Sequence, residues 1–370
     1  MFSLLCIFII FYGLEKILGF KNKDIVRYSN GISRDVRLRE HNPYSFQEFF
    51  PDQLFLDMHP ANSFLKKFII RIDKNGFIMP SERHDDPDLK IVFLGASTTE
   101  CLFNEETKRF PYLVGEYLEK ETGLKINAYN GGKGGNNTLH SINILLNKIF
   151  PMKPDIVVMK HAFNDLVILL LEKTYWNNNP KRSPVRIVKE QYHLLDALKH
   201  SLATLLPNIG MEMEKILRKK MKLRGMGDEF RHARGRKIDV DKEYLLNEFK
   251  KNLATFVELC RIRNITPVLM TQANRLRKDP DAFVSQSMVG FENDYGVDYS
   301  RFQELYNLFN LAIREIGENK NVLVVDLDKE VPKENLYMFD IIHYTELGSQ
   351  KAAAIISRQL LTLADKQGKN

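Results

Sequence analysis

Short apolar runs alternate with amphipathic segments along most of the chain, from residue 89 to residue 364. Apolar runs of about four to eight residues between turn-forming residues predict buried strands, and apolar positions that recur every three or four residues predict helices. The pattern predicts strands at 90–96, 125–131, 154–162, 266–273 and 321–328. It predicts helices at 110–123, 138–150, 242–264, 301–319 and 345–364.

The alternation of strands and helices predicts the fold class. Short strands that are apolar throughout and separated by helices are typical of a parallel sheet that helices cover on both faces. We therefore expect an α/β protein, a three-layer α/β/α sandwich with a mostly parallel sheet. In such sheets ligands bind beyond the carboxyl ends of the strands, so the side chains that follow each strand are the candidates for chemistry.

Two segments depart from this pattern. Residues 21–87 carry mixed charge and several prolines, and we expect them to form an N-terminal extension packed on the domain of residues 88–364. Within the extension, residues 68–80 predict two short strands around an Asn-Gly turn. Residues 172–238 are an insertion with helical segments, and its second half is rich in Lys and Arg. Such an insertion is either a solvated charged face or a lid or patch that meets anionic lipid or glycan.

The N-terminus is strongly apolar. Residues 1–13 read MFSLLCIFIIFYG, and the run extends to residue 20 only if Glu15 and Lys16 are included. A helix needs about 20 apolar residues to cross a bilayer. The segment has no basic start and no small-residue cleavage site, which disfavours a cleaved signal peptide. We expect residues 1–20 to be an uncleaved membrane anchor or an interfacial helix, and a core helix of the soluble fold is the alternative.

Composition and charge exclude several classes of protein. The chain has 370 residues, of which 44% are hydrophobic and 27% are charged, as is typical of a globular fold with a large core. The net charge of +7 suits anionic partners, but there is no zinc-ligand cluster, no GxxxxGK motif and no RNA-binding aromatic signature. Nucleic acid is therefore not expected as a partner, and no metal or organic cofactor is expected. The cysteines Cys6, Cys101 and Cys260 predict no disulfide framework.

Polar residues follow three of the predicted strands and precede the last predicted helix. Ser97 follows the first strand in GAST, a glycine cluster NGGKGG follows the second, and Asn164 follows the third in FND. The motif DIIH, with Asp340 and His343, precedes the last helix. Each has a local alternative. Ser97 and Glu100 can form a helix capping box, the Asn-Asp pair and the glycines can form turns, and the histidine can be an ordinary polar residue.

The four motifs stand in the order of the SGNH hydrolase superfamily, also called GDSL-type esterases, and residues 89–364 resemble that family. The resemblance implies that Ser97 is the nucleophile of a catalytic triad completed by His343 and Asp340. The chemistry of the residues agrees with these roles. A serine hydroxyl is a weak nucleophile that needs a neighbouring base. An imidazole can take its proton near neutral pH, and a carboxylate can then stabilise the imidazolium.

The resemblance also implies an oxyanion hole. Its donors would be the main-chain N–H groups of Ser97 and Gly135 and the side-chain amide of Asn164, which together stabilise a tetrahedral intermediate. Gly134 and Gly135 are adjacent candidates for this glycine, and Gly135 is preferred because it lies five residues after Asn130, as in the family motif. The chain departs from the family pattern in two places. Gly-Asp-Ser reads Gly-Ala-Ser, and the glycine of Gly-x-Asn-Asp is replaced by Ala162.

The resemblance implies a serine ester hydrolase that works without a cofactor. We expect it to cleave O-acetyl or other short acyl esters of carbohydrate or lipid-linked substrates through an acyl-enzyme on Ser97. Two alternatives are an O-acyltransferase that moves the acyl group to a cell-surface glycan and a catalytically silent scaffold that binds a glycan or a protein. With an anchor at residues 1–20, the resemblance implies a bacterial envelope protein with an extracytoplasmic catalytic domain. The basic residues from Lys16 to Arg27 favour the opposite orientation.

Overall fold

The computed structural model divides the chain into two compact units. One unit combines residues 1–37 with 185–229, and the other combines residues 38–184 with 230–370. All the strands and helices predicted from the hydrophobic pattern fall in the second unit. The residues that the structure describes are 9–14, 16–17, 32–51, 67–189, 229–236 and 238–367.

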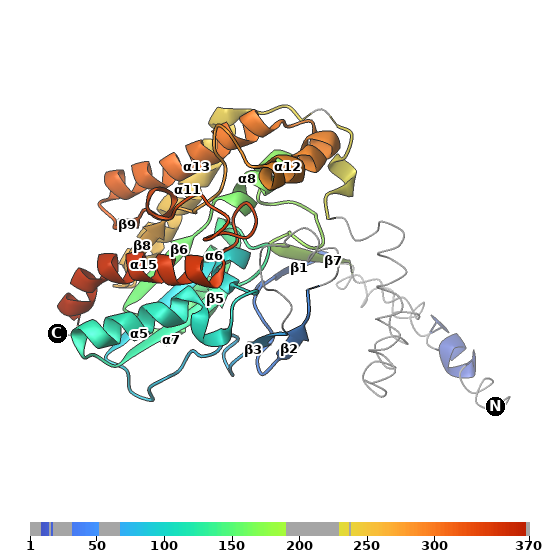
Figure 1. Cartoon of the computed structure of the whole chain (residues 1–370). Coiled ribbons are helices and arrows are strands. Elements are labelled where there is room, and N and C mark those ends of the chain that lie inside the picture. Colours follow the sequence, from blue (N-terminus) through green and yellow to red (C-terminus); the bar gives the residue numbers. More distant parts are fainter. Residues whose placement is uncertain are drawn as a thin grey trace. The chain divides into compact units, whose positions relative to one another are not determined.

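The second unit is built on a five-stranded parallel sheet with the order β5-β4-β6-β8-β9 (Figure 1). Because β4 pairs in parallel with both β5 and β6, the loops that follow these three strands leave the sheet from the same edge. The strands are β4 (Leu89–Gly95), β5 (Ile126–Gly132), β6 (Ile156–Lys160), β8 (Thr266–Met270) and β9 (Val324–Val325).

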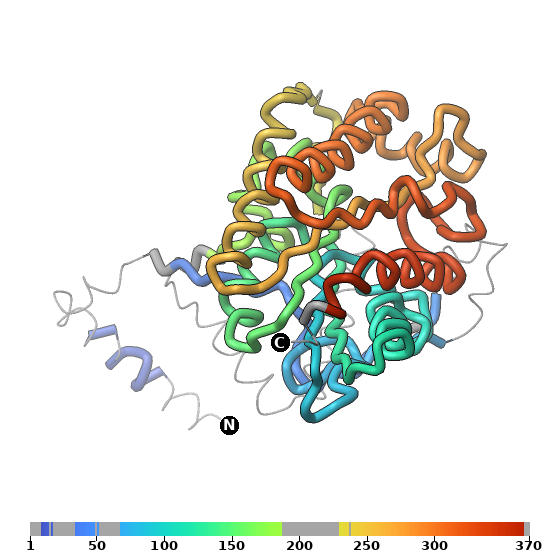
Figure 2. The backbone as a smooth tube through the Cα atoms, turned by 90° about the vertical axis from the view of Figure 1, so that its left-hand side faces the viewer, coloured from blue at the N-terminus to red at the C-terminus, as the bar shows by residue number. Residues whose placement is uncertain are grey.

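Helices cover both faces of this sheet, and β4 shows why. Its side chains alternate between two cores: Val92 and Leu94 pack in one, and Ile91 and Phe93 in the other. The Ile91 face is covered by α5 and α15, which lie side by side in Figure 2. The two helices are α5 (Phe110–Thr122) and α15 (Glu346–Gln367). The Val92 face is covered by α6 (Thr138–Ile144), α8 (Phe163–Glu172), α11 (Lys242–Ile262), α12 (Ala282–Tyr295) and α13 (Tyr299–Lys320).

The predicted α/β fold, with a mostly parallel sheet and helices on both faces, is confirmed. The last strand is shorter than predicted, because only Val324 and Val325 pair with β8. The helix predicted at 138–150 is α6 continued by a π-turn and a further short turn. The shorter helical elements are the π-turn Leu145–Ile149, α7 (Phe150–Met152), α14 (Leu327–Glu330) and the 3₁₀ turns Glu106–Lys108 and Arg231–Ala233.

Two of the longer helices, α8 and α12, were not predicted. The sequence of α8, FNDLVILLLE, is apolar almost all round, so it lacks the polar face that marks an amphipathic helix. Seven of its ten residues are buried, which explains why the polar face is missing. The helix α12 has a weak apolar pattern and buries only Val284, Met288 and Tyr295.

The part of the second unit that precedes β4 adds a small antiparallel sheet. It consists of β2 (Phe46–Phe49) and β3 (Phe68–Arg71). The predicted Asn-Gly turn is present: Asp73 Oδ1 accepts hydrogen bonds from the N–H groups of Asn75 and Phe77, at 2.7 and 2.9 Å. The second strand predicted after this turn forms only isolated bridges, at Ile78.

The described part of the first unit is small. It contains the antiparallel pair β1 (Ile32–Val36) and β7 (Val185–Lys189), and residues 9–14 and 16–17 are helical. Within the described residues, no helix is both long enough and apolar enough to cross a membrane. Most of the basic insertion predicted at 172–238 lies outside the described residues, as do residues 1–8, 15 and 18–20 of the predicted anchor.

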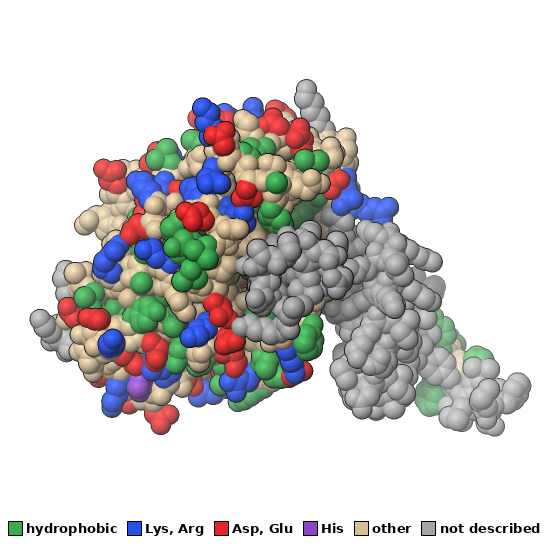
Figure 3. All heavy atoms as spheres, in the orientation of Figure 1, with side chains coloured by type: hydrophobic (Ala, Val, Ile, Leu, Met, Phe, Trp, Pro, Cys, Tyr) green, Lys and Arg blue, Asp and Glu red, His purple; other side chains and the backbone are tan. Residues whose placement is uncertain are grey.

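Basic and acidic side chains are mixed over the face of the second unit that Figure 3 shows. Several of them pair: Arg314 lies 2.7 Å from both Asp326 and Asp328, and Lys320 lies 2.9 Å from Glu258.

The space around Gly132 shows how closely β5 packs against α4 (Ser97–Glu100), the short helix after β4. A Cβ at Gly132 would lie 2.3 Å from the Glu100 main-chain nitrogen and 2.6 Å from the Thr99 carbonyl carbon. We expect Gly132→Ala to displace α4 and to lower the free energy of unfolding by about 1–3 kcal/mol, measured by urea denaturation. Gly290→Ala is the control, since a Cβ there meets nothing within 4 Å. Equal stabilities of both variants would contradict the close packing.

Candidate active site

Ser97 is the first residue of α4, and only Ala96 separates it from the end of β4. The helix is capped by Ala96, whose side chain forms no capping hydrogen bond. Ser97 and Glu100 form no capping box, because Ser97 lies inside the helix and is not its N-cap residue. The Glu100 carboxylate lies 3.0 Å from His41 Nε2. The structure therefore does not show the local alternative in which Ser97 and Glu100 only cap a helix.

The Ser97 hydroxyl instead meets the imidazole of His343, which lies in the loop before α15. Ser97 Oγ and His343 Nε2 are 2.8 Å apart, and His343 Nδ1 lies 2.6 Å from Asp340 Oδ2. Asp340 Oδ1 accepts hydrogen bonds from the main-chain N–H groups of Ile342 and His343, at 2.8 and 2.7 Å. With its carboxylate held in this way, Asp340 accepts a hydrogen bond from Nδ1–H, and Nε2 is left free to accept a hydrogen bond from the Ser97 hydroxyl.

The charges of Asp340 and His343 stabilise each other. Burial alone would raise the pKa of Asp340, but the His343 charge and the hydrogen bonds to the carboxylate hold that pKa below its usual value. Burial alone would lower the pKa of His343, but the charge and hydrogen bond of Asp340 outweigh it, so the pKa lies above its usual value. The two side chains remain 26% and 29% exposed, so water screens part of this interaction. The imidazole beside Ser97 is therefore a stronger base than an isolated histidine.

Aromatic rings fix the plane of the imidazole. The His343 ring stacks on Phe339, with centroids 5.7 Å apart and planes inclined by 13°. Phe339 in turn packs edge-to-face against Phe103, at 5.3 Å and 80°. Phe103 continues the series with an edge-to-face contact to Phe68 at 5.7 Å. This packing restricts rotation of the imidazole away from Ser97.

Strand register brings the other predicted site residues to the same edge of the sheet. Gly95, the last residue of β4, is paired with Gly132 of β5 and with Lys160 of β6. The three strands therefore end at one level. Ser97, Gly135 and Asn164 follow these ends by two, three and four residues respectively.

Gly135 lies in the loop after β5 with φ of +79°, a conformation that favours glycine. A Cβ there would lie 2.2 Å from Arg182 Nη1. The Gly135 carbonyl accepts hydrogen bonds from Arg39 Nη1 at 3.2 Å and from Arg182 Nη1 at 2.5 Å. No described residue accepts a hydrogen bond from the main-chain N–H of Gly135 or of Ser97.

Asn164 lies in the first turn of α8 and is half-buried. Its carboxamide forms no hydrogen bond with any described residue. The substitution of alanine for the family's glycine at Ala162 is compatible with this turn, because Ala162 has φ of −164°, which any residue adopts. All three predicted oxyanion-hole donors thus have no partner in the described part of the chain. Their mutual orientation toward a substrate stays a prediction.

A buried network that was not predicted ties the Asn164 turn to the loop of Gly135. Asp165 Oδ1 accepts hydrogen bonds from Thr138 N at 3.0 Å, Thr138 Oγ1 at 2.6 Å and Tyr175 Oη at 2.7 Å. Burial raises the pKa of Asp165 to about 6, although these hydrogen bonds oppose the shift. The only sequence signal for the network is that Asp165 adjoins Asn164 and Thr138 opens the helix after the glycine loop.

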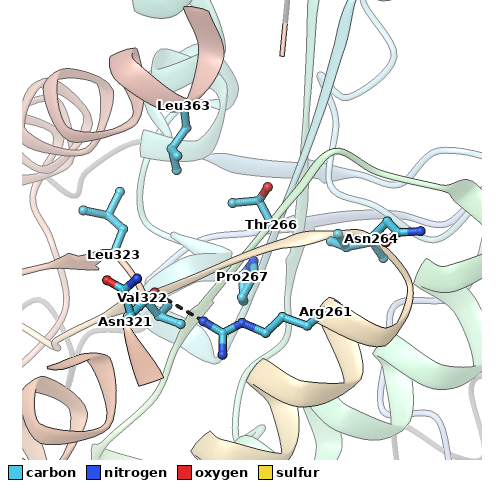
Figure 4. Close-up of a pocket in the computed structure, with 9 residues that line it drawn as sticks. Arg261, Asn264, Thr266, Pro267, Asn321, Val322, Leu323 and Leu363 are labelled. Carbon is cyan, nitrogen blue, oxygen red and sulfur yellow. Dashed lines mark hydrogen bonds between the residues drawn. The ribbon is translucent and has the colours of Figure 1, made fainter. Parts of the chain in front are cut away.

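A small cavity adjoins Ser97 and His343. Its volume, counted as the space that the centre of a water-sized sphere can occupy, is about 10 Å³. The cavity therefore has room for one water-sized group. Its remaining wall is largely apolar and is formed by Thr98, Cys101, Leu102, Phe103, Asn104, Phe339 and Tyr344. A larger hollow of about 340 Å³ lies at the other edge of the sheet, at the start of β8, beside Arg261 and Pro267 (Figure 4). Among the described residues, no three His, Cys, Asp or Glu side chains are grouped as metal ligands would be.

No family model matches the sequence, and no curated protein matches it significantly. Solved structures do align with most of the chain, at low identity. A lipase/acylhydrolase from Enterococcus faecalis is 17% identical with a TM-score of 0.42, covering 74% of this chain and 96% of its own. A putative GDSL-like lipase from Parabacteroides merdae is 13% identical with a TM-score of 0.44, covering 76% and 98%. The acetylxylan esterase Axe2 from Geobacillus stearothermophilus is 15% identical with a TM-score of 0.43, covering 74% and 94%.

The electrostatics of the site give a direct prediction. We expect the pKa of His343, followed by the NMR shift of its ring protons, to lie above that of a free histidine. Asp340→Asn removes the charge that holds the pKa up, so the pKa of His343 should fall in that variant. An Asp340→Asn variant in which His343 titrates as in the wild type would show that the carboxylate does not act on the imidazole.

Proposed function

We propose that the chain is a serine ester hydrolase of the SGNH type that works through an acyl-enzyme on Ser97. The observation that carries this proposal is the 2.8 Å contact between Ser97 Oγ and His343 Nε2, with Asp340 2.6 Å behind the imidazole. A hydroxyl, an imidazole and a carboxylate in line are the components of an activated nucleophile.

Acylation starts with the attack of Ser97 Oγ on the ester carbonyl carbon. His343 Nε2 takes the hydroxyl proton as the new C–O bond forms, and the carbonyl electron pair moves to its oxygen. The imidazolium is stabilised by Asp340. When the tetrahedral intermediate collapses, the bond to the alcohol oxygen breaks, and His343 returns its proton to the leaving alcohol. The acyl group is then bonded to Ser97.

The negative oxygen of the intermediate needs hydrogen-bond donors that are not already engaged. The main-chain N–H groups of Ser97 and Gly135 and the carboxamide of Asn164 meet this requirement among the described residues. The Gly135 N–H belongs to the same peptide group as the Gly134 carbonyl, and Arg39 Nη2 donates a hydrogen bond to that carbonyl at 3.3 Å, which helps to fix the orientation of the donor. Donors held in advance cost no reorganisation when the charge develops.

Deacylation repeats these steps with water. His343 takes a proton from a water molecule whose oxygen attacks the acyl carbon, and the proton then returns to Ser97 Oγ as the acid leaves. If a sugar hydroxyl takes the place of this water, the same residues perform acyl transfer. Water is the simpler acceptor, and hydrolysis is therefore the activity that we propose.

The size of the cavity beside Ser97 and His343 supports a substrate with a short acyl group. At about 10 Å³ it has room for one water-sized group, which matches the methyl of an acetyl ester. Phe103 and Phe339 form part of its wall and pack edge-to-face at 5.3 Å, so a longer chain that entered would have to displace a packed ring. We propose O-acetyl esters as the substrate class, carried by carbohydrate or by lipid-linked molecules.

The apolar residues 1–20 support a membrane partner. We propose that this segment attaches the protein to a bacterial envelope membrane with the catalytic unit outside the cytoplasm, where acetylated surface glycans are found. Detergent-dependent extraction of the full chain, compared with a chain that lacks residues 1–24, distinguishes this from a soluble protein.

The triad gives a kinetic prediction. Ser97→Ala and His343→Ala should each lower kcat for p-nitrophenyl acetate by about 10³-fold or more, and the double variant should lose no more than either single one, because the residues act as a unit. Asn164→Ala should lower kcat by about 10²- to 10³-fold. Ser287→Ala, at an exposed hydroxyl in α12, is the control. Turnover that survives Ser97→Ala would contradict the proposal, and acetyl transfer to added alcohols in place of acetate release would favour the transferase.

The cavity gives a prediction about acyl length. Wild-type kcat/KM should be higher for p-nitrophenyl acetate than for the butyrate. Phe103→Ala enlarges the cavity and should lower the acetate-to-butyrate ratio by about tenfold. Phe46→Ala, which removes a ring that is 56% exposed on β2, should leave the ratio unchanged. A Phe103→Ala variant that is folded and keeps the wild-type ratio would show that the acyl chain does not enter this cavity.

A further inference from the structure

Lys160 is a buried lysine that the mechanism above does not use. It is the last residue of β6 and is 0% exposed. Its ammonium donates a hydrogen bond to the carbonyl of Thr98 at 2.9 Å. It forms no ion pair with a carboxylate of any described residue. A buried charge without a counter-ion is costly, so its presence beside the site requires a reason.

The groups that do contact this ammonium adjoin the reacting residues. Thr98 follows Ser97, and Tyr344 follows His343. Lys160 Nζ lies 4.7 Å from the centroid of the Tyr344 ring and 4.5 Å from that of Phe110. These distances are those of cation–π contacts. The Lys160 ammonium thus contacts both the chain segment that carries Ser97 and the segment that carries His343.

Each segment has hydrogen bonds of its own, such as that from Gln272 Nε2 to Thr98 Oγ1 at 3.3 Å and that from Phe339 N to the His343 carbonyl at 3.0 Å. The Thr98 carbonyl and the Tyr344 side chain, however, have few partners besides Lys160. The helix α4 has only four residues, and in the described residues the Thr98 carbonyl accepts no main-chain N–H; Lys160 and the Cys101 thiol, at 3.3 Å, are its donors. The Tyr344 hydroxyl is buried and has no hydrogen-bond partner in the described part of the chain. The Tyr344 ring is therefore held through its face by Lys160 and by an edge-to-face contact with Phe110 at 6.2 Å.

We propose that Lys160 is a positioning residue that holds Ser97 and His343 at hydrogen-bonding distance by binding the Thr98 carbonyl and the Tyr344 ring together. This inference rests on the proposed ester hydrolase function. Lys160 touches neither the substrate nor the reacting atoms. It acts through the residue that follows each of them.

The ammonium also acts on the site through its charge. Burial lowers the pKa of Lys160 to about 7, an effect that the nearby Cys101 thiol opposes. The Lys160 charge lowers the pKa of His343 and of the buried His161, and it lowers that of Cys101. Tyr344 is the other titratable group packed against it. Removing the charge should therefore raise the pKa of His343 further.

The experiment compares wild type with Lys160→Met, which keeps the length of the side chain and removes its charge. Lys90→Met is the matched control, because Lys90 on β4 also donates to a main-chain carbonyl, that of Met152 at 3.0 Å, and lies at the opposite end of the sheet. We expect Lys160→Met to lower kcat for p-nitrophenyl acetate by about 10- to 100-fold with little change in KM. The acid limb of the kcat/KM profile should move to higher pH. Lys90→Met should leave both quantities unchanged.

A stability measurement separates positioning from support of the fold. The pKa of Lys160 is about 7 in the folded state against 10.5 for an ordinary lysine, so its burial costs most below pH 7 and least above pH 10.5. Lys160→Met should therefore gain stability relative to wild type as the pH falls from 10 to 6, while it loses activity. Failure of Lys160→Met to fold, or full activity with an unmoved acid limb, would overturn the proposal. A wild type that hydrolyses no ester would overturn the proposed function itself, which distinguishes the two failures.

Discussion

The hydrogen bond between Ser97 Oγ and His343 Nε2 is the interaction on which the functional interpretation depends. Its partners are 246 positions apart in the sequence, so only the folded sheet can bring them together. The parallel sheet does so by ending β4, β5 and β6 at one level. The chain after each of these strands then lies at one edge. Tight glycine contacts, such as that of Gly132 with Glu100, hold α4 directly on the strand ends.

In the proposed mechanism, the charges around His343 determine how readily it activates Ser97. Burial and the Lys160 charge lower the pKa of His343, whereas Asp340 and Glu100 raise it, so the basicity of the imidazole reflects opposing effects. The carboxylate of Asp340 and the ammonium of Lys160 differ in how much their burial costs in stability. Asp340 is about a quarter exposed and receives two main-chain hydrogen bonds, whereas Lys160 is buried with one hydrogen bond and two aromatic rings. Stability that is given up at a buried charge of this kind is typical of functional sites.

Much of this arrangement could be predicted from the sequence, and the rest could not, for physical reasons. Apolar strands separated by helices predicted the parallel sheet. The family resemblance, carried by motifs that include GAST and DIIH, predicted which hydroxyl and imidazole would meet. The helix α8 was missed because burial on all sides removes the polar face that reveals a helix. Lys160 was missed because a lysine that closes an apolar strand is ordinarily an exposed residue that marks where the strand ends. Its partners, the Thr98 carbonyl and the Tyr344 ring, depend on distances that the sequence does not contain.

The central claim is that Ser97 is a nucleophile activated by His343. Peptide mapping by mass spectrometry, after the full chain has reacted with a fluorophosphonate, tests it most directly. We predict one adduct, on the peptide that contains Ser97. The rate of its formation should rise with pH as His343 loses its proton. The His343→Ala variant should form no adduct. Labelling of another residue, or equal labelling of Ser97 with and without the imidazole, would contradict it.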